Sequence, residues 1–389
     1  MRALVLGAGR MGRAAAWDLA RQPGMGAVKL VDHDGDALAN SARELERLLT
    51  GTTGGGAARI ETARGDLDDT VSLPAMMEGS DVVLSSADYR FNEALTRAAI
   101  EAGVQLCDLG GNLFVVERQI ALSEAAEKRG ITVIPDCGLA PGMAGLFAAW
   151  GVERMQSVDS VKLRVGGLPA HPKPPLGYKL VFSVRGLTNE YLEPADVLRD
   201  GKPARVASLT DVEELEFPYP FGKLEAFNTS GGSSTLPSTF AGKVRELDYK
   251  TIRYPGHVAA FAGMQQIGLL SEEPVDAVVP RVFTEKLLER ALTDDDTDVV
   301  LMRVTVSGTR DGERGTLVFE LIDRHDAKTG HSAMARTTAY SAAAVAYMLA
   351  AGAVEKRGVL PGELAVPLGS FAGAVRARGL DVKEHWEPA

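Results

Sequence analysis

Short apolar runs alternate with stretches of helical periodicity over the first third of the chain. The runs are RALVLGA (2–8), AVKLVDHD (27–34), RIETARGDL (59–67), DVVLSSA (81–87), VQLCDLGG (104–111) and ITVIPDCG (131–138), and the helical stretches include 12–21, 35–49 and 91–102. Strands interleaved with helices of this length predict an α/β domain with a doubly wound parallel sheet. The glycine-rich segment 50–58 is interpreted as a solvent loop.

The pattern changes after residue 140. The segment GGLPAHPKPPLG (166–177) is too rich in proline and glycine for regular structure and is interpreted as a linker or mobile flap. Beyond it, short strand candidates over 161–254, an amphipathic helix over 275–293 and a hairpin over 299–322 predict an α+β domain with a mixed or antiparallel sheet. The acidic run 294–298 is interpreted as a solvated loop. The 389 residues exceed the size of a single core, so we expect two domains, 1–140 and 141–333.

The sequence Gly7-Ala8-Gly9-Arg10-Met11-Gly12 follows the first strand and opens the first helix, and Asp32 ends the next strand. The first glycine allows a tight turn, the second lets a pyrophosphate approach the backbone, and the third lets helix and strand pack closely. This pattern predicts a Rossmann-type dinucleotide site. A carboxylate at position 32 would bind a ribose diol and repel a 2'-phosphate, which favours NAD over NADP, although His33 and Arg10 temper that preference.

Other strand ends of the same sheet should border this site, because ligands of such sheets bind beyond the carboxyl ends of the strands. A plain turn stays an alternative for the glycine pair 110–111. The residues expected there are Ser85, Ser86, Asp108, Gly110, Gly111 and Asn112.

Charge and composition narrow the function classes. The chain has 42 lysines and arginines against 52 acidic residues, a net charge of -10, so we expect neither nucleic acid nor membrane as a partner. The apolar run at the amino terminus is too short for a signal-peptide core, and no apolar stretch reaches the length of a membrane span, which predicts a cytoplasmic protein. The six histidines show no metal-binding spacing. Two cysteines make no disulfide framework, and Cys137 is expected to be a small buried residue.

Four segments, CGLAPG (137–142), GLTNEY (186–191), GKLEAFNTSGGSSTLP (222–237) and YKTIRYPGH (249–257), resemble the saccharopine dehydrogenase-like reductases, and within them the lysine-oxidising branch. The resemblance implies oxidative deamination of the ε-amino group of L-lysine with NAD, giving ammonia and 2-aminoadipate 6-semialdehyde, which cyclises to piperideine-6-carboxylate. It also implies that C-terminal helices over 334–371 complete the nucleotide domain, and that the other domain forms a dimer. The substrate-binding positions it implies are Glu190, Glu225, Thr229, Ser230, Arg253 and Tyr254.

Residues 247–254, if extended, place Arg253 on one face of a strand and Tyr254 on the other. A guanidinium binds a carboxylate in bidentate fashion, as an amino-acid substrate would require, and an ordinary salt bridge is the alternative. His257 follows a Pro-Gly turn, which would present it at a cleft and let it titrate near neutral pH. A structural histidine in a loop is the alternative there.

An amine with a pKa near ~10.4 must lose a proton before hydride can leave its neighbouring carbon, so a base is needed. The candidates are His257, Tyr89 and Asp136, with Asp108 as a further possibility. Two other functions stay open: a reductase that joins an amine to an oxo-acid, as in saccharopine or carboxynorspermidine formation, and a non-catalytic dinucleotide-binding protein. The former needs a second anion pocket, for which Arg185 and Lys179 are the further cations.

Overall fold

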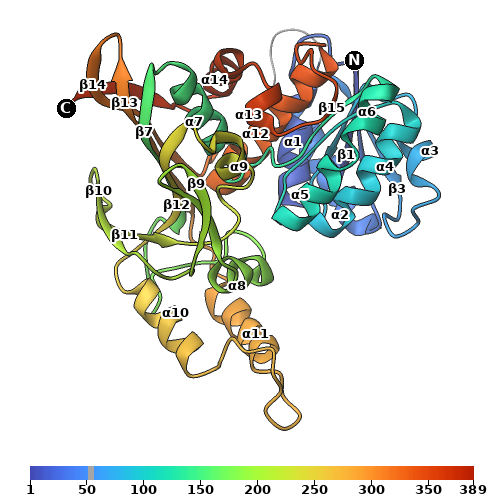
Figure 1. The fold of residues 1–389 in the computed structure, drawn as a ribbon. Helices are drawn as coiled ribbons and strands as arrows, with labels where there is room; N and C mark the ends of the chain where they lie inside the picture. Colours follow the sequence, from blue (N-terminus) through green and yellow to red (C-terminus); the bar gives the residue numbers. More distant parts are fainter. Residues whose placement is uncertain (51–56) are drawn as a thin grey trace. The chain divides into compact units, whose positions relative to one another are not determined.

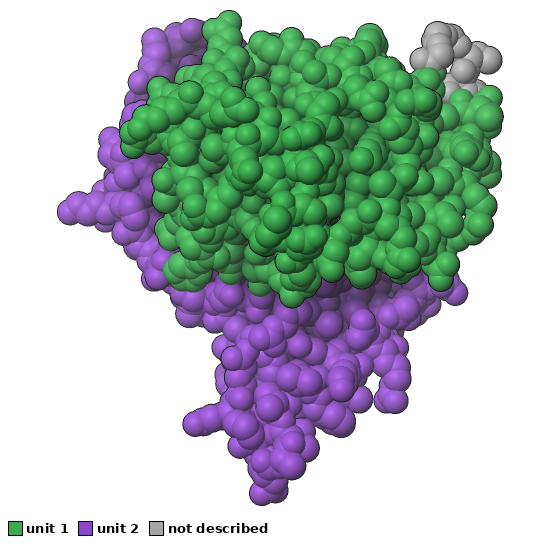
Figure 2. Space-filling view, turned by 90° about the vertical axis from the view of Figure 1, so that its right-hand side faces the viewer, with its two compact units in different colours: residues 1–149, 327–331, 335–380 green, residues 150–326, 332–334, 381–389 purple. Residues whose placement is uncertain are grey.

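A computed structural model describes residues 1–50 and 57–389 (Figure 1). The chain divides into two compact units, residues 1–149, 327–331 and 335–380, and residues 150–326, 332–334 and 381–389 (Figure 2). The sequence-based boundaries were 1–140 with 334–371, and 141–333. Most of the glycine-rich segment 50–58 lies outside the described residues. No helix among the described residues is both long and apolar enough to span a membrane.

The first unit is built on a seven-stranded parallel sheet. Its order, β15-β6-β5-β4-β1-β2-β3, reverses direction at β1, which is the strand order of a dinucleotide-binding sheet. The strands are β1 (Arg2–Leu6), β2 (Ala27–Asp32), β3 (Arg59–Arg64), β4 (Val82–Ser85), β5 (Gln105–Asp108), β6 (Thr132–Ile134) and β15 (Gly358–Val359).

Helices connect these strands and cover the sheet. They are α1 (Arg10–Ala20), α2 (Gly35–Leu49), α3 (Leu73–Met77), η1 (Tyr89–Phe91), α4 (Asn92–Ala102), α5 (Leu113–Ile120), α6 (Ser123–Arg129), α7 (Met143–Glu153), α12 (Ala333–Ala350), α13 (Gly362–Ala365) and α14 (Leu368–Ala377). The fully buried Leu4, Leu6, Val83 and Leu106 from neighbouring strands form one core with α4 and α6. Four consecutive buried residues in β1 and in β4 explain why these strands read as continuous apolar runs.

The second unit is built on a mixed sheet of order β10-β11-β12-β7-β13-β14-β16, with β8 and β9 attached at β12. Only β12 and β7 pair in parallel; the other pairs are antiparallel. The strands are β7 (Ser157–Pro169), β8 (Ala195–Arg199), β9 (Lys202–Val206), β10 (Glu213–Phe217), β11 (Gly222–Asn228), β12 (Val244–Arg253), β13 (Asp298–Arg310), β14 (Glu313–Arg324) and β16 (Lys383–Pro388). Its helices are α8 (Val184–Leu192), α9 (Leu236–Phe240), α10 (His257–Gln266) and α11 (Pro280–Leu292). The prediction of one domain with a parallel sheet and a second domain with a mixed sheet is confirmed.

Two local predictions in this unit are wrong in part, since residues 170–177 do lack helix and strand. The segment 166–177 is not a linker throughout, because β7 continues to Pro169 and a Cβ on Gly166 would lie 2.5 Å from the carbonyl oxygen of Ile252. Close strand packing, and not a flexible turn, requires that glycine. The acidic run is not merely solvated, because Asp298 is buried and accepts hydrogen bonds from the amides of Ala333 and Met334 at 2.7 and 2.9 Å.

Candidate functional site

The turn between β1 and α1 has the geometry of an anion cradle. Gly7 has a φ of +95°, and a Cβ on Gly12 would lie 1.8 Å from the Gly7 carbonyl oxygen, so neither position tolerates a side chain. Gly9 is exposed, caps α1 and has nothing within 4 Å of a built Cβ. The predicted Arg10 and Met11 form the first turn of α1, which contains no acidic residue. The open backbone at a helix start therefore fits a dinucleotide pyrophosphate.

Asp32 braces this turn from the end of β2. One carboxylate oxygen accepts the Ala8 amide at 2.7 Å, and the other accepts the Asp34 amide at 2.9 Å and lies 3.0 Å from Nδ1 of His33. A carboxylate has about four acceptor positions, so capacity for ribose hydroxyls remains. Asp32 thus fits its predicted role and also stabilises the loop.

The two serines at the end of β4, Ser85 within the strand and Ser86 directly after it, are used differently from the prediction. The Ser86 hydroxyl donates to the Leu6 carbonyl oxygen at 2.8 Å and would touch a Cβ on Gly7 or Gly12. Ser85 is 1% exposed, with its hydroxyl 3.4 Å from Oδ1 of Asn92. Ser85 therefore does not line a ligand site, because packing against α4 buries it.

Asp108 is also buried, and its side chain holds neighbouring segments together through hydrogen bonds. Its carboxylate accepts from Gln119 Nε2 and the Gly110 amide, both at 2.8 Å, and from the Asp136 amide at 3.2 Å. Burial raises the pKa of Asp108, and these hydrogen bonds oppose that rise. The prediction that Asp108 lines the crevice or acts as a base is wrong, because the loops after β5 and β6 close over it.

Those loops bring two other predicted residues beside the glycine pair. A Cβ on Gly110 would lie 1.7 Å from Oδ1 of Asp136, and one on Gly111 would lie 2.9 Å from the Tyr89 ring. Both glycines have positive φ, 75° and 130°. Glycine is therefore required at both positions, because the side chains of Asp136 and Tyr89 approach the backbone too closely for a Cβ. A plain turn does not by itself explain the glycine pair. Asn112 caps α5 by accepting the Val115 amide at 3.3 Å.

Cys137 follows this loop and is 1% exposed, as predicted for a small buried residue. Burial raises the pKa of the Cys137 thiol, and contact with Cys107 adds to the effect. Both properties disfavour a thiolate nucleophile.

In the second unit, Arg253 at the end of β12 is 2% exposed. Its Nε donates to the Tyr191 hydroxyl at 3.0 Å, its Nη1 donates to the Ile252 carbonyl oxygen at 2.9 Å, and its guanidinium lies 4.6 Å from the centre of the Tyr178 ring. Among the described residues no carboxylate forms an ion pair with it and Nη2 has no acceptor. Burying a guanidinium without an anion is costly, so the site is suited to an anionic ligand group.

His257 completes a directional chain of hydrogen bonds behind Arg253. Its Nδ1 lies 3.0 Å from the Leu176 carbonyl oxygen and therefore carries the proton, which leaves Nε2 to accept from the Tyr191 hydroxyl at 2.9 Å. The ring is 1% exposed and stacks on Phe261. Burial, aided by the charge of Arg253, lowers the pKa of His257 to about 3. The expected cleft position and near-neutral titration are wrong, and the structural alternative describes the residue better.

Glu190 is the carboxyl group of this cluster that titrates near neutral pH. It precedes Tyr191 on α8, and burial raises its pKa to about 7 while Arg253 opposes the rise. The Ser230 amide donates to the Glu190 carbonyl oxygen at 3.0 Å and ties the glycine-serine loop to α8. The buried Thr229 hydroxyl lies 2.7 Å from that of Thr251.

Two predicted substrate residues are used elsewhere. Glu225 accepts the amides of Gly256 and Val258 at 3.1 and 2.7 Å, so its carboxylate caps the start of α10. Tyr254 donates to the Pro169 carbonyl oxygen at 3.2 Å and packs against a core that contains Leu168, whereas Arg253 lies over the Tyr178 ring. The alternation of side chains along β12 predicted this separation. Tyr178, by contrast, was missed, because no local spacing signals a ring beneath a guanidinium.

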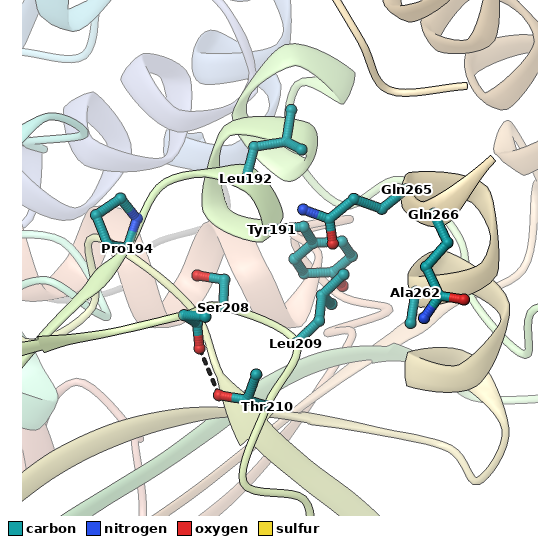
Figure 3. Close-up of a pocket in the computed structure, with 10 residues that line it drawn as sticks. Tyr191, Leu192, Pro194, Ser208, Leu209, Thr210, Ala262, Gln265 and Gln266 are labelled. Carbon is teal, nitrogen blue, oxygen red and sulfur yellow. Dashed lines mark hydrogen bonds between the residues drawn. The ribbon is translucent and has the colours of Figure 1, made fainter. Parts of the chain in front are cut away.

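A separate cavity of about 390 Å³ lies at the C-terminal end of α8 (Figure 3). Tyr191 borders it, while its hydroxyl belongs to the hydrogen-bond chain just described. Apart from Tyr191, no ionisable side chain lines the cavity, and none of the predicted site residues does. The lining residues are Tyr191, Leu192, Pro194, Ala207, Ser208, Leu209, Thr210, Ala262, Gln265 and Gln266.

Comparison with known proteins identifies the class. The family model of the saccharopine dehydrogenase NADP binding domain matches residues 3–134, and that of the saccharopine dehydrogenase C-terminal domain matches residues 138–378. The chain therefore belongs to the saccharopine dehydrogenase family, and its first unit is a pyridine-nucleotide-binding domain.

Individual relatives are more distant. The chain is 26% identical to mitochondrial alpha-aminoadipic semialdehyde synthase of Rattus norvegicus over 54% of its own length and 23% of that protein. It is 26% identical to saccharopine dehydrogenase [NADP(+), L-glutamate-forming] of Pyricularia oryzae, over 64% of this chain and 58% of the enzyme. It is 23% identical to carboxynorspermidine synthase of Vibrio cholerae over 77% of each. The chain thus covers less than two thirds of the first two relatives.

A solved structure shows the same fold over the whole chain. Apo saccharopine dehydrogenase (L-Glu forming) of Saccharomyces cerevisiae superimposes with a TM-score of 0.79 at 19% identity and covers 99% of both chains.

Proposed function

We propose that this chain is an NAD-dependent oxidoreductase of the L-lysine 6-dehydrogenase type, which oxidatively deaminates the ε-amino group of L-lysine. The observation that carries the proposal is Arg253, a buried guanidinium without an ion pair among the described residues, in a unit attached to a nucleotide-binding domain. The products are ammonia and 2-aminoadipate 6-semialdehyde, which cyclises to piperideine-6-carboxylate.

Arg253 and Glu190 together suit the α-carbon of an amino acid. Nη2 of Arg253 is available to a carboxylate, and the Glu190 carboxylate, which interacts electrostatically with Arg253, offers an acceptor for the adjacent ammonium. The hydrogen-bond chain through Tyr191 to His257 holds the guanidinium in one orientation. We therefore assign His257 a positioning role in place of a catalytic one.

The supply of cations favours a substrate with a single carboxylate. Arg185 forms ion pairs with Glu272 and Glu285, and Lys179 Nζ donates to the carbonyl oxygens of Asp294 and Asp296. Both cations considered for a second anion pocket are therefore already engaged, and neither is available to bind a second carboxylate of a substrate. Saccharopine has more carboxylates than lysine and would need such a pocket.

Proton transfer is assigned to the first unit. The ε-ammonium must lose a proton, water must then add to the substrate iminium, and the departing nitrogen must be protonated. Asp136 and Tyr89, which follow different strands and lie beside Gly110 and Gly111 respectively, are the proposed groups for these transfers. When bound, the nicotinamide supplies the hydride acceptor.

The coenzyme preference rests on Asp32. Its negative charge beside the cradle would repel a 2'-phosphate, which supports NAD. The matching family domain is named for NADP, and His33, 3.0 Å from Asp32, and Arg64, which donates to the His33 carbonyl oxygen at 3.0 Å, would soften the repulsion. Both coenzymes therefore belong in the assay.

The names of the relatives support a second candidate, reductive condensation of an amine with an oxo-acid, as in saccharopine or carboxynorspermidine formation. A panel assay separates the two. Purified chain is mixed with NAD or NADP and with lysine, saccharopine, carboxynorspermidine or cadaverine, and absorbance of reduced nicotinamide is followed.

We expect rapid NAD reduction with lysine and little with cadaverine, which lacks the carboxylate. Norleucine, which lacks the ε-amine, should inhibit without turnover. Turnover of saccharopine in preference to lysine would assign the chain to the second candidate. Coenzyme binding without turnover of any amine would leave a non-catalytic dinucleotide-binding protein.

A further inference from the structure

The segment between β7 and α8, residues 170–183, contains neither helix nor strand, and we call it the strap. Its backbone and side chains are tied to the segment that joins α11 to β13. The Ala170 amide donates to the Thr297 carbonyl oxygen at 2.8 Å, and Nζ of Lys179 donates to the Asp294 carbonyl oxygen at 2.9 Å. The acidic run therefore holds the proline-rich strap in a defined position.

The strap contributes two groups to the surroundings of Arg253. The Leu176 carbonyl oxygen accepts from Nδ1 of His257 at 3.0 Å and so fixes the tautomer that receives the Tyr191 hydroxyl. Two positions later, the Tyr178 ring lies under the guanidinium, with its centre 4.6 Å from Cζ of Arg253. A segment without helix or strand thus supplies both the end of the hydrogen-bond chain and an aromatic surface.

The Tyr178 ring is buried and neutral. It meets the His257 ring edge-on, with the ring centres 5.3 Å apart, and belongs to the same core as Phe261. Burial raises the pKa of Tyr178 to about 12, and the charge of Arg253 opposes the rise. Near neutral pH the guanidinium therefore faces an uncharged aromatic ring, whose face attracts a cation without neutralising it.

The contacts of Arg253 differ in what they restrain. The N–H groups of a guanidinium lie in its plane, so the hydrogen bonds from Nε to Tyr191 and from Nη1 to the Ile252 carbonyl oxygen hold two edges of the group. They do not cover its faces. The Tyr178 ring covers one face and excludes water there, which strengthens the charge-assisted bonds that the guanidinium can make.

We propose that Tyr178 is a positioning residue for substrate binding: its ring fixes the plane of the Arg253 guanidinium and keeps water from one face, so that Nη2 is directed at the substrate carboxylate. This role rests on the proposed function, in which Arg253 binds the α-carboxylate of an amino acid. The strap and the acidic run then act on the substrate site through Tyr178.

Two substitutions separate the ring of Tyr178 from its hydroxyl group. Tyr178→Phe keeps the aromatic face and should leave the Michaelis constant for lysine within about threefold of wild type. Tyr178→Leu should raise it about 10- to 30-fold, with a smaller change in kcat, because the carboxylate is remote from the reacting carbon. Phe217→Leu is the matched control, since the Arg303 guanidinium lies 4.2 Å from the centre of the Phe217 ring in the same unit. Thermal melts establish that every variant is folded.

A double-mutant cycle with Arg253→Ala shows whether the ring acts through the guanidinium. In the Arg253→Ala background, Tyr178→Leu should lower kcat/KM for lysine no further, and neither substitution should change the dissociation constant for NAD. Additive losses in the cycle, an unchanged Michaelis constant in Tyr178→Leu, or equal impairment of Tyr178→Phe and Tyr178→Leu overturns the positioning role.

The same measurements distinguish failure of this role from failure of the proposed function. Turnover of saccharopine in place of lysine contradicts the function, and the cycle is then measured with saccharopine, which also presents carboxylates to Arg253. Without turnover of any amine, calorimetric titration with norleucine gives the four affinities of the cycle. A wild-type chain that binds none of these amino acids overturns the positioning role together with the function.

Discussion

The hydroxyl of Tyr191 donates a hydrogen bond to Nε2 of His257 at 2.9 Å. The hydroxyl oxygen of Tyr191 therefore accepts a hydrogen bond from Nε of Arg253 at 3.0 Å. A neutral imidazole, fixed in one tautomer by the Leu176 carbonyl oxygen, thereby sets the direction of a buried guanidinium. The histidine acts through the tyrosine on the residue proposed to bind substrate.

Arg253→Ala should raise the Michaelis constant for lysine by about 30- to 1000-fold, corresponding to about 2–4 kcal/mol for a buried charge-assisted contact. Arg303→Ala is the matched control, since Arg303 also lies over an aromatic ring, at 4.2 Å from the centre of Phe217, but is paired with Glu320. Steady-state kinetics with both variants provide the measurement. An unchanged Michaelis constant in Arg253→Ala would remove this residue from the carboxylate role.

The pH dependence of stability should differ between two variants of the buried cluster. Between pH 4.5 and 6.5 the unfolded chain protonates His257 but not Glu190, whereas the folded chain protonates Glu190, whose pKa is about 7, but not His257, whose pKa is about 3. The two contributions oppose each other at about 1.4 kcal/mol per pH unit each.

His257→Gln removes the contribution that increases with pH. The unfolding free energy of this variant, relative to wild type, should therefore fall as pH rises through that window, and that of Glu190→Gln should rise. Urea denaturation at several pH values measures both differences. Parallel curves for all three proteins would contradict the assigned burial.

Substrate affinity should depend on the ionisation of Glu190. Its carboxyl group, with a pKa of about 7, must be ionised to hold the α-ammonium, so the Michaelis constant for lysine should rise as pH falls below 7. Glu190→Gln should weaken binding at high pH and flatten this limb. Glu273→Gln, at an exposed carboxyl group of the same unit that is not among the charges acting on Glu190, is a suitable control. A wild-type limb that persists in Glu190→Gln would assign the titration to another group.

The two glycines of the cradle should respond differently to alanine. Gly12→Ala places a Cβ 1.8 Å from the Gly7 carbonyl oxygen and should lower both stability and coenzyme affinity. Gly9→Ala meets nothing within 4 Å and has a φ of -71°, so its melting temperature should stay the same while the dissociation constant for NAD rises about tenfold or more. Calorimetric titration and thermal melts distinguish the two. Equal NAD affinity in Gly9→Ala and wild type would place the pyrophosphate elsewhere.

Coenzyme choice should shift with the charge at position 32. Asp32→Asn keeps an acceptor for the Ala8 amide but removes the negative charge, so the ratio of NADP to NAD efficiency should increase about tenfold. Asp34→Asn, which alters the cap of α2 next to it, should leave the ratio near that of wild type. A ratio that does not move in Asp32→Asn would exclude this carboxylate as the discriminator.

Local sequence patterns were sufficient to predict three features: the parallel sheet, the glycine cradle, and the opposite directions of the Arg253 and Tyr254 side chains. Each follows from short-range geometry: continuous apolar runs for strands buried on both faces, glycine where a Cβ cannot fit, and alternation along an extended strand. These constraints act within a few residues, so the order of amino acids carries them directly.

Burial and hydrogen-bond partners depended on the tertiary structure. Tyr191 and His257 are 66 positions apart, and only the packing of α8 against α10 turns a loop histidine into a desolvated acceptor. Tertiary packing also decides the roles of two carboxylates. Asp108 accepts hydrogen bonds from Gln119 and from the Asp136 amide, and Glu225 accepts the Val258 amide at the start of α10. Desolvation and pairing are properties of neighbours brought together by the fold, and no local spacing specifies them.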